Sequence, residues 1–458
     1  MCKINTKKSN TQVETELFKF EDSKKSVVCS FTAPDLSSNG GLLLLSQVEK
    51  KCAFLSKLAS LINDWRNPDF VVHSMDELVK QRVMQIAAGF EDADDCDRLR
   101  KDSALKMSVG LTPNSYDLAS QPTMTRLENH VSHKELYAIG DLFIENYLDS
   151  YESAPASVTI DLDDTNSNTY GAQQLTLFND YYGEYCYMPL LAFDAATGRL
   201  VLPMLRPGRV NKRVNVNGLM RRLVIKLRKR WPKTKIIIRG DGQFCSHEFM
   251  TWANTQKDVF FITGMSANSV LLGRVAGLAD HAKFLYKKDG QKVKLYTRFL
   301  YRAQSWKTMQ YVIAKVEYSE MGLNIRFIVT NITCARAKEL YESGYCQRGN
   351  CELYIKELKT YLKADRMSCN SFSANQFRLF LHSAAYVLIL QAKEKLFAGT
   401  ELSAVSIMTF REKIILSAIR ITEMKTRIKV EFQSDHAMRK ELETAMRRAV
   451  GWTGRKTA

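Results

Sequence analysis

The sequence of 458 residues has no Cys-x-x-Cys pair among its ten cysteines and no apolar run long enough to cross a bilayer. Zinc ribbons use paired cysteines and disulfide frameworks are typical of short secreted chains, so both are excluded and a reducing compartment is expected. The best apolar run, residues 379–390, is interrupted by His382 and Ser383, whereas a membrane-spanning helix needs about 20 apolar residues. Residues 1–10 are polar and lack the apolar core of a signal peptide, so we expect a cytoplasmic protein with no membrane segment.

Acidic residues are also scarce relative to basic ones. The chain has 49 Asp and Glu against 66 Lys and Arg, which leaves a formal charge of +17. Such a surplus repels itself unless a polyanion neutralises it, so charge alone favours nucleic acid as the partner. A basic soluble enzyme with scattered surface lysines is the alternative. The content of 45% hydrophobic and 25% charged residues is that of a folded globular chain, which excludes wholesale disorder.

The chain divides into regions of different sequence texture. Residues 1–40 are largely polar and are expected to form a flexible arm. Apolar residues in 41–150 recur at intervals of three and four, which predicts a helical N-terminal domain. We expect this domain to bind DNA, although no helix-turn-helix stands out in it. We expect a helical C-terminal region over 401–458, with helices through residues 405–432.

Short extended patterns begin near residue 156. Residues 157–164 alternate apolar and polar side chains, which predicts a strand. Two more strands, a helix, a fourth strand, a short helix and a fifth strand are predicted next, with the strands at 185–193, 200–205, 235–241 and 259–263 and the longer helix around 219–227. A three-stranded meander followed by crossover helices is the topology of the RNase H-like fold, so we predict an α/β protein with that core.

We place this RNase H-like core in residues 151–267 and 335–400. Between its halves, residues 268–334 contain several alternating runs, which predict a β-rich insertion. After the insertion, residues 336–362 are expected to form one long helix and residues 374–396 another.

Two of the predicted central strands end in an aspartate. Asp163 closes the first and Asp241 follows the fourth. Neighbouring strands would bring these ends within a few ångströms, where two carboxylates repel each other unless cations lie between them. Oxygen ligands suit Mg²⁺ or Mn²⁺, and a third acid would complete a site for two such ions.

The long helix after the insertion can supply the third acid. Tyr345, Arg348, Glu352 and Lys359 fall on one stripe of a regular helix, roughly 60° wide at about 100° per residue, and Lys356 shares it. Glu352 is therefore the candidate, flanked by cations and a phenol. The alternative is a solvated helix on which Arg348 and Glu352 form an ordinary i,i+4 ion pair.

Two other features are consistent with DNA binding, and each also has an alternative explanation. Residues 206–239 hold thirteen Lys or Arg and no acid, and the helix there presents Arg221 and Arg222 outward, which suits phosphate binding. A solvated basic face is the alternative. Trp306 could stack on an unpaired base near a cleavage site, or lie in the core of the insertion.

Residues 345–352, Tyr-Cys-Gln-Arg-Gly-Asn-Cys-Glu, followed by Lys359, resemble the Tyr-Arg-Glu-Lys signature of DDE-type transposases from bacterial insertion sequences. Further matching motifs extend the resemblance to the group called transposase DDE group 1, the insertion-sequence family thirteen-eighty, over residues 40–420. These motifs are Asp-Leu-Asp-Asp-Thr at 161–165, Tyr-Gly-Ala-Gln-Gln at 170–174, Arg-Pro-Gly at 206–208, Arg-Gly-Asp at 239–241 and Ala-Asn-Gln-Phe-Arg at 374–378.

The resemblance implies an RNase H-like core whose catalytic and metal-binding triad is Asp163, Asp241 and Glu352, holding two Mg²⁺ or Mn²⁺ ions. Asp163 is preferred because the family's first acid stands two positions before Thr or Ser, which is Thr165 here. Asp161 is expected to support it from behind. The family usually has Ser-Gly-Phe after its second aspartate, whereas residues 242–244 are Gly-Gln-Phe, which leaves loop geometry and activity open.

The resemblance also implies a function. The protein would cut DNA at the inverted-repeat ends of an insertion sequence and join the freed 3′-hydroxyls to target DNA, as a homodimer on double-stranded DNA, associated with a bacterial nucleoid. Arg348 and Lys359 would hold phosphates, with Tyr345 against the backbone or a base. The alternatives are an RNase H-like nuclease without strand joining, and a catalytically weak or inactive DNA-binding protein derived from a transposase.

Overall fold

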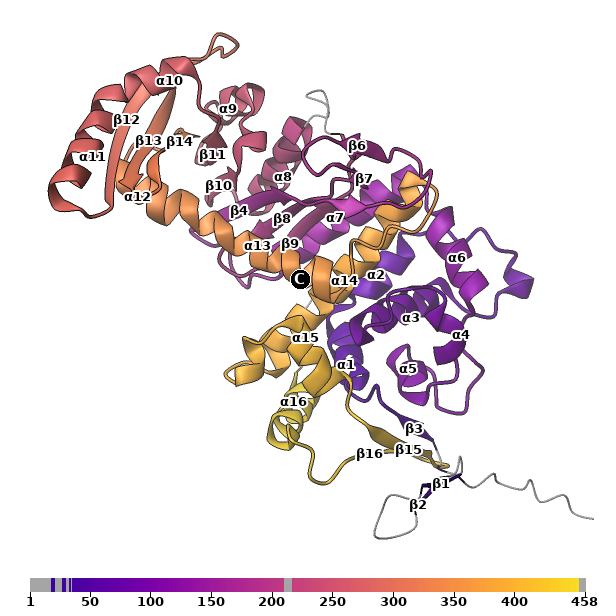
Figure 1. Cartoon of the computed structure of the whole chain (residues 1–458). Helices are drawn as coiled ribbons and strands as arrows, with labels where there is room; N and C mark the ends of the chain where they lie inside the picture. Colours follow the sequence, from indigo (N-terminus) through magenta and orange to yellow (C-terminus); the bar gives the residue numbers. More distant parts are fainter. Residues whose placement is uncertain (1–17, 21–26, 30–32, 34, 210–215, 453–458) are drawn as a thin grey trace, which may run out of the picture.

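The computed structural model describes residues 18–20, 27–29, 33, 35–209 and 216–452. A large mixed sheet runs from the upper left of the view to its middle, helices lie along both of its faces, and the N-terminal helices lie beside it (Figure 1). Most of the expected arm lies outside the described residues. Within it, β1 (Phe18–Phe20) pairs with β2 (Val27–Cys29).

The central sheet has eight strands in the order β12-β13-β14-β11-β10-β4-β8-β9. Strands β4, β10 and β11 are parallel, and every other neighbouring pair is antiparallel. The predicted order of three strands, helix, strand, helix and strand is confirmed by β4 (Ser157–Asp164), β8 (Leu190–Asp194), β9 (Leu200–Met204), α8 (Val216–Arg230), β10 (Lys235–Gly240), α9 (His247–Ala253) and β11 (Val259–Met265).

The single strand predicted at 185–193 is wrong, because it divides into two elements. Its first part, β7 (Glu184–Tyr187), pairs with β5 (Ser167–Asn168) and β6 (Leu177–Asn179) in a small separate sheet. Pro189 separates β7 from β8, and a proline has no backbone N–H with which to continue a ladder. The small sheet therefore projects from the end of β4 where Asp163 lies.

The strands expected in the insertion extend the central sheet itself. β14 (Gly322–Thr330) pairs with β11, and β13 (Gln310–Ser319) and β12 (Val293–Tyr301) continue outward from it. Two helices precede them, α10 (Ser269–Arg274) and α11 (Ala276–Asp289). Their apolar residues join the same core as α8 and α9, so this segment enlarges the sheet and its cover.

The two faces of the sheet are covered by different helices. Val158, Ile160 and Leu162 of β4 belong to the core formed with α8, α9 and α11. Alternation along the strand turns Asp161 and Asp163 to the opposite face, where α13 (Gly349–Lys356) and α14 (Phe372–Leu396) pack. The acids of the candidate site therefore lie under the helix that carries Glu352.

The N-terminal helices share one apolar core with α14 and the C-terminal region. The helices are α1 (Leu42–Cys52), α2 (Phe54–Ser60), η1 (Pro68–Phe70), α3 (Met75–Ala88), α4 (Asp95–Leu99), α5 (Ser103–Ser108), α6 (Gln121–His130) and α7 (His133–Asp149), as predicted for 41–150. Helix α14 is apolar around most of its surface because neighbours surround it (Figure 1).

The helices expected through residue 432 are a further correction. After η6 (Glu401–Ser403) and α15 (Ile407–Phe410), the helical part ends with η7 (Arg411–Ile415). The chain then forms a hairpin of β15 (Ile419–Glu423) and β16 (Ile428–Phe432), and β3 (Leu36–Ser37) adds to its edge. Both strands alternate β-branched or aromatic with polar residues, the period-two signal of a strand. Helix α16 (Arg439–Gly451) follows.

The long helix predicted for 336–362 is present but irregular. It runs through α12 (Ala337–Glu339), a π turn η3 (Leu340–Tyr345), a 3₁₀ turn η4 (Cys346–Arg348), α13 and a second π turn η5 (Glu357–Tyr361). Each change of helix type changes the rotation per residue, so the single stripe calculated for a regular helix does not hold. Across the described parts of the chain, no helix is long and apolar enough to span a membrane.

Candidate active site

Two aspartates meet at the carboxyl ends of adjacent parallel strands. Gly240 of β10 lies opposite Leu162 of β4, so the next residues, Asp241 and Asp163, lie side by side at this edge of the sheet. The Asp241 carboxylate accepts a hydrogen bond of 2.9 Å from the Gln243 backbone N–H, which fixes it at the start of η2 (Gly242–Phe244). Asp163 is buried, with 8% of its surface exposed.

The charge on Asp163 is strongly disfavoured. Burial raises the pKa of its carboxyl, Arg348 opposes this, and the neighbouring Asp241 and Asp164 raise it further, to about 6. Removal from water and like charges nearby act in the same direction. The end of β4 is therefore a place where a cation is stabilised.

Arg348 supplies a cation from the irregular helix. Its Nη1 lies 2.8 Å from Asp163 Oδ2, and its Nη2 lies 3.8 Å from Glu352 Oε1. Burial lowers the pKa of Arg348, but the carboxylates of Asp163, Asp241 and Glu352 together with Tyr345 outweigh it. Two of the three predicted acids, Asp163 and Glu352, thus lie within ion-pair distance of one guanidinium, and Asp241 acts on it through its charge.

The acids are not close enough to one another to form a preassembled metal cluster. Within the described residues, no group of three His, Cys, Asp or Glu side chains is placed to hold an ion, and the Glu352 side chain is 68% exposed. The expectation that the three carboxylates share ions directly is therefore not met in this conformation. The donor set still fits Mg²⁺ or Mn²⁺, because two carboxylates with an unfavourable mutual charge lie side by side.

Tyr345 packs against the backbone that carries Asp241. A Cβ atom added to Gly264 of β11 would lie 2.7 Å from the Tyr345 hydroxyl and 2.8 Å from the Gly242 nitrogen. Only glycine permits this approach of the helix to the sheet. Burial raises the pKa of the Tyr345 phenol, which keeps it neutral.

The unusual glycine after Asp241 is not required by the backbone. Gly242 does not adopt a positive φ, and a Cβ atom there would meet only Gly264, at 3.8 Å. We therefore expect Gly242→Ser, which restores the family residue, to change the free energy of unfolding by less than about 0.5 kcal/mol. Urea unfolding of the variant beside the native protein measures this, and a large loss would show that the loop depends on glycine.

Lys359 holds the segment that follows the first aspartates. Its Nζ donates to the Asn166 carbonyl at 2.6 Å, to Asn166 Oδ1 at 2.9 Å and to Thr165 Oγ1 at 3.3 Å. It fixes the turn after β4 in this conformation. Lys356 is exposed, with its Nζ 5.8 Å from the centre of the Tyr361 ring.

Two buried ion pairs stabilise the strand ends. The roles of their arginines were not predicted from the sequence. Arg239 donates two hydrogen bonds to Asp161, of which the one from Nη2 to Oδ2 is 2.7 Å long. It also donates a hydrogen bond to the Gly344 carbonyl. Arg206 pairs with Asp164, with 4% of each side chain exposed. Asp161 is thus paired with Arg239 on the strand that also carries Asp163. The Arg-Gly-Asp and Arg-Pro-Gly motifs contained the signal for both arginines.

The basic helix α8 faces acidic residues of α7. Arg222 pairs with Asp141, and Lys226 Nζ lies 3.0 Å from the other Asp141 oxygen. Arg221 lies over the Trp252 ring, with its Cζ 5.5 Å from the ring centre. These cations have partners within the chain, so the structure does not present them as the free phosphate-binding face that the composition indicated.

Trp306 lies at the other end of the sheet from the acids. It is in the β12–β13 loop, beside Tyr311 at the start of β13, which pairs with Thr330 at the end of β14. Because β14 runs antiparallel to β11, this loop lies toward the amino end of β11, whereas the acids lie at the carboxyl ends of the parallel strands. Its half-buried ring packs edge to face on Tyr301, with ring centres 5.6 Å apart. Trp306 is therefore not part of this site.

Known proteins resemble the chain as follows. A family model described as "Transposase DDE domain group 1" matches residues 19–450, a range that includes every residue of the candidate site. No curated protein sequence matches. A solved piggyBac transposase synaptic complex with hairpin DNA is similar in structure, with 11% sequence identity, a TM-score of 0.44, and coverage of 82% of this chain and 79% of that chain.

Proposed function

Because the chain belongs to the transposase DDE group 1 family and is a DNA transposase, we propose that Asp163, Asp241 and Glu352 cut DNA at the ends of a mobile element and join the 3′-hydroxyls to target DNA. The observation that supports this most is the buried Asp163 beside Asp241, with Arg348 as their counter-cation. We also propose that β9, β8, β4, β10 and β11 are an RNase H-like core, and that the element is a bacterial insertion sequence of family thirteen-eighty.

The chain's own residues divide the work in this proposal. Asp163 and Asp241 would hold divalent ions, and Glu352, whose side chain is exposed, would be the third ligand. Lys359 keeps the turn after β4 in place, and Arg348, once displaced from Asp163, is free to bind a phosphate with its bidentate fork. Bound Mg²⁺ or Mn²⁺ would make a water nucleophilic and stabilise charge on the scissile phosphate.

The partner in this proposal is double-stranded DNA, as inverted-repeat ends and as target, and two copies of the chain hold the two ends. The test is purified protein with Mg²⁺ and a DNA fragment carrying the inverted repeats. Cleavage followed by joining supports the transposase. Cleavage without joining favours the nuclease, and binding without cleavage favours the inactive derivative.

We expect Arg348→Ala to favour metal binding, because it removes the guanidinium that competes with the ion for Asp163. Without divalent ions the variant should lose roughly 2 kcal/mol of stability, because the charged hydrogen bond to buried Asp163 is lost. With Mn²⁺ it should gain more thermal stability than the native protein does, since no cation must first leave Asp163. Thermal unfolding with and without Mn²⁺ measures both effects.

The control for this experiment is Arg302→Ala, which removes an exposed arginine in the β12–β13 loop. It should respond to Mn²⁺ as the native protein does. An equal Mn²⁺ response in all three proteins would show that Arg348 does not occupy the ion's place.

A further inference from the structure

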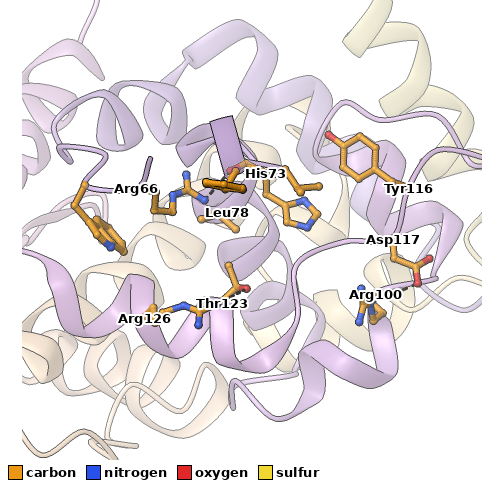
Figure 2. Close-up of a pocket in the computed structure, with 11 residues that line it drawn as sticks. Arg66, His73, Leu78, Arg100, Tyr116, Asp117, Thr123 and Arg126 are labelled. Carbon is orange, nitrogen blue, oxygen red and sulfur yellow. Dashed lines mark hydrogen bonds and ion pairs between the residues drawn. The ribbon is translucent and has the colours of Figure 1, made fainter. Parts of the chain in front are cut away.

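A concave site lies in the N-terminal helical domain, outside the candidate active site. It is a pocket of about 380 Å³, within the size range of small-ligand sites. Its lining residues are Trp65, Arg66, Phe70, Val72, His73, Leu78, Arg100, Tyr116, Asp117, Thr123 and Arg126. Figure 2 shows that they approach it from several separate segments.

Cations dominate the charge of the pocket lining. Arg66, Arg100 and Arg126 outnumber Asp117, the one acid that lines it. Asp64 holds Arg66 at 2.6 Å, and Arg100 lies 3.5 Å from Asp117.

Arg126 is the cation with donors to spare. It is exposed on α6, and within the described residues its guanidinium donates one long hydrogen bond, of 3.3 Å, to Thr123 Oγ1. An exposed guanidinium at the rim of a positive pocket is suited to a phosphate. The field of Arg100 and Arg66 reinforces the effect of burial in lowering the pKa of His73, although Glu77 opposes them.

Aromatic rings complete the rim. Phe70, at the end of η1, is 82% exposed although the turn beneath it is rigid, with Pro68 at its first position and the Asn67 side chain capping it. Tyr116 is 46% exposed, and its hydroxyl is fixed by a 2.6 Å hydrogen bond to Glu77. Exposed rings at the rim of a pocket that also carries a spare arginine are typical of surfaces that stack on nucleic-acid bases.

We propose that this pocket binds an unstacked nucleotide of a DNA strand, with the base against Phe70 and Tyr116 and the phosphate on Arg126. The inference rests on the proposed function, because it takes DNA as the partner. It assigns a particular contact to the N-terminal domain, where the sequence shows no helix-turn-helix. The charge selects a phosphate, and the rings select a base with an accessible face.

The experiment measures DNA affinity by fluorescence anisotropy, in EDTA, so that cleavage chemistry plays no part. The probes are a blunt duplex, the same duplex with a single-stranded adenine overhang, and free dAMP. The variants are Phe70→Ala and Arg126→Ala. Their matched controls are Phe284→Ala on α11, whose phenylalanine is 62% exposed, and Arg302→Ala.

We expect the overhang duplex to bind more tightly than the blunt duplex. Phe70→Ala should weaken overhang binding about tenfold, with a smaller effect on the blunt duplex, since one stacked base is lost. Arg126→Ala should reduce the salt dependence, the slope of log affinity against log salt, by about 1. A fluorescent adenine analogue in the overhang should be quenched by the native protein and less by Phe70→Ala.

Each other outcome overturns the proposal. Equal overhang affinity for Phe70→Ala and Phe284→Ala would remove the pocket from DNA binding while leaving the transposase proposal intact. If Phe70→Ala lost the same affinity for both duplexes, the pocket would contact only the DNA backbone. If free dAMP bound the native protein as tightly as the overhang duplex does, the pocket would be a site for free nucleotides. If the native protein bound neither duplex, the proposed function itself would fail.

Discussion

Asp163→Asn is expected to abolish DNA cleavage, by at least about a thousandfold, while DNA binding persists. The asparagine keeps the shape of the side chain but removes one anionic oxygen from the pair with Asp241, and divalent ions stabilise the transition state by several kcal/mol. Asp241→Asn should have a similar effect. The two together should cost little more than either alone, because residues that act as a unit are not additive. Cleavage of inverted-repeat DNA in Mg²⁺ measures this.

The matched control is Asp289→Asn, at the exposed end of α11, which should cleave at the native rate. Native-level cleavage by Asp163→Asn would exclude Asp163 from catalysis. Stability separates a chemical loss from an unfolded protein, because Asp163→Asn should not be destabilised at neutral pH. A buried carboxylate with a raised pKa is a cost to folding that the amide lacks.

The pH dependence of stability gives an independent check of the Asp163 environment. Its pKa rises from 3.8 in the unfolded chain to about 6 in the fold, so the folded state binds more protons between these values. The Asp163 contribution is therefore most favourable below about pH 4 and is lost as the pH rises through about 6. The free energy of unfolding of the native protein, compared with that of Asp163→Asn, should therefore fall as the pH rises from about 4 to about 6. Urea unfolding of both proteins at a series of pH values measures this.

The sequence was sufficient for the elements whose pattern is local. The alternation in residues 157–164 predicted the bounds of β4, and the Ile-rich run at 235–241 predicted β10 to within one residue. Because neighbouring parallel strands end at one edge of a sheet, the placement of Asp163 beside Asp241 also followed from these patterns. Period-two alternation at 419–432 was equally available, and the helical interpretation of that segment overlooked it.

Features that depend on distant partners could not be predicted in this way. Composition showed that α8 is basic, but not that Asp141 of α7 would lie against Arg222. The π turns η3 and η5 have no periodic signal, so the orientation of Glu352 and Lys359 could not be calculated from a regular helix.

A charged network buried under α14 explains one of the family-like motifs. Glu128 of α6 accepts hydrogen bonds of 2.8 Å from Arg82 of α3 and from Arg378, the last residue of the Ala-Asn-Gln-Phe-Arg motif. None of the three side chains is more than 3% exposed. The motif is thus structural, because it joins the N-terminal helices to the helix that follows the candidate active site.

Glu128→Ala is therefore expected to destabilise the protein by about 3–5 kcal/mol, because it leaves two buried guanidinium groups without their carboxylate. Burial alone would raise the pKa of Glu128, but Arg378 and Arg82 outweigh it and lower the value to about 2. Since the pKa is depressed in the fold, this stabilisation is complete above the unfolded value of 4.5 and is lost as the pH falls towards 2. Urea unfolding at neutral and acid pH measures both effects.

The control is Glu145→Ala, on the solvent side of α7, which should lower the free energy of unfolding by less than about 1 kcal/mol. A similarly small loss for Glu128→Ala would contradict the role given to this network.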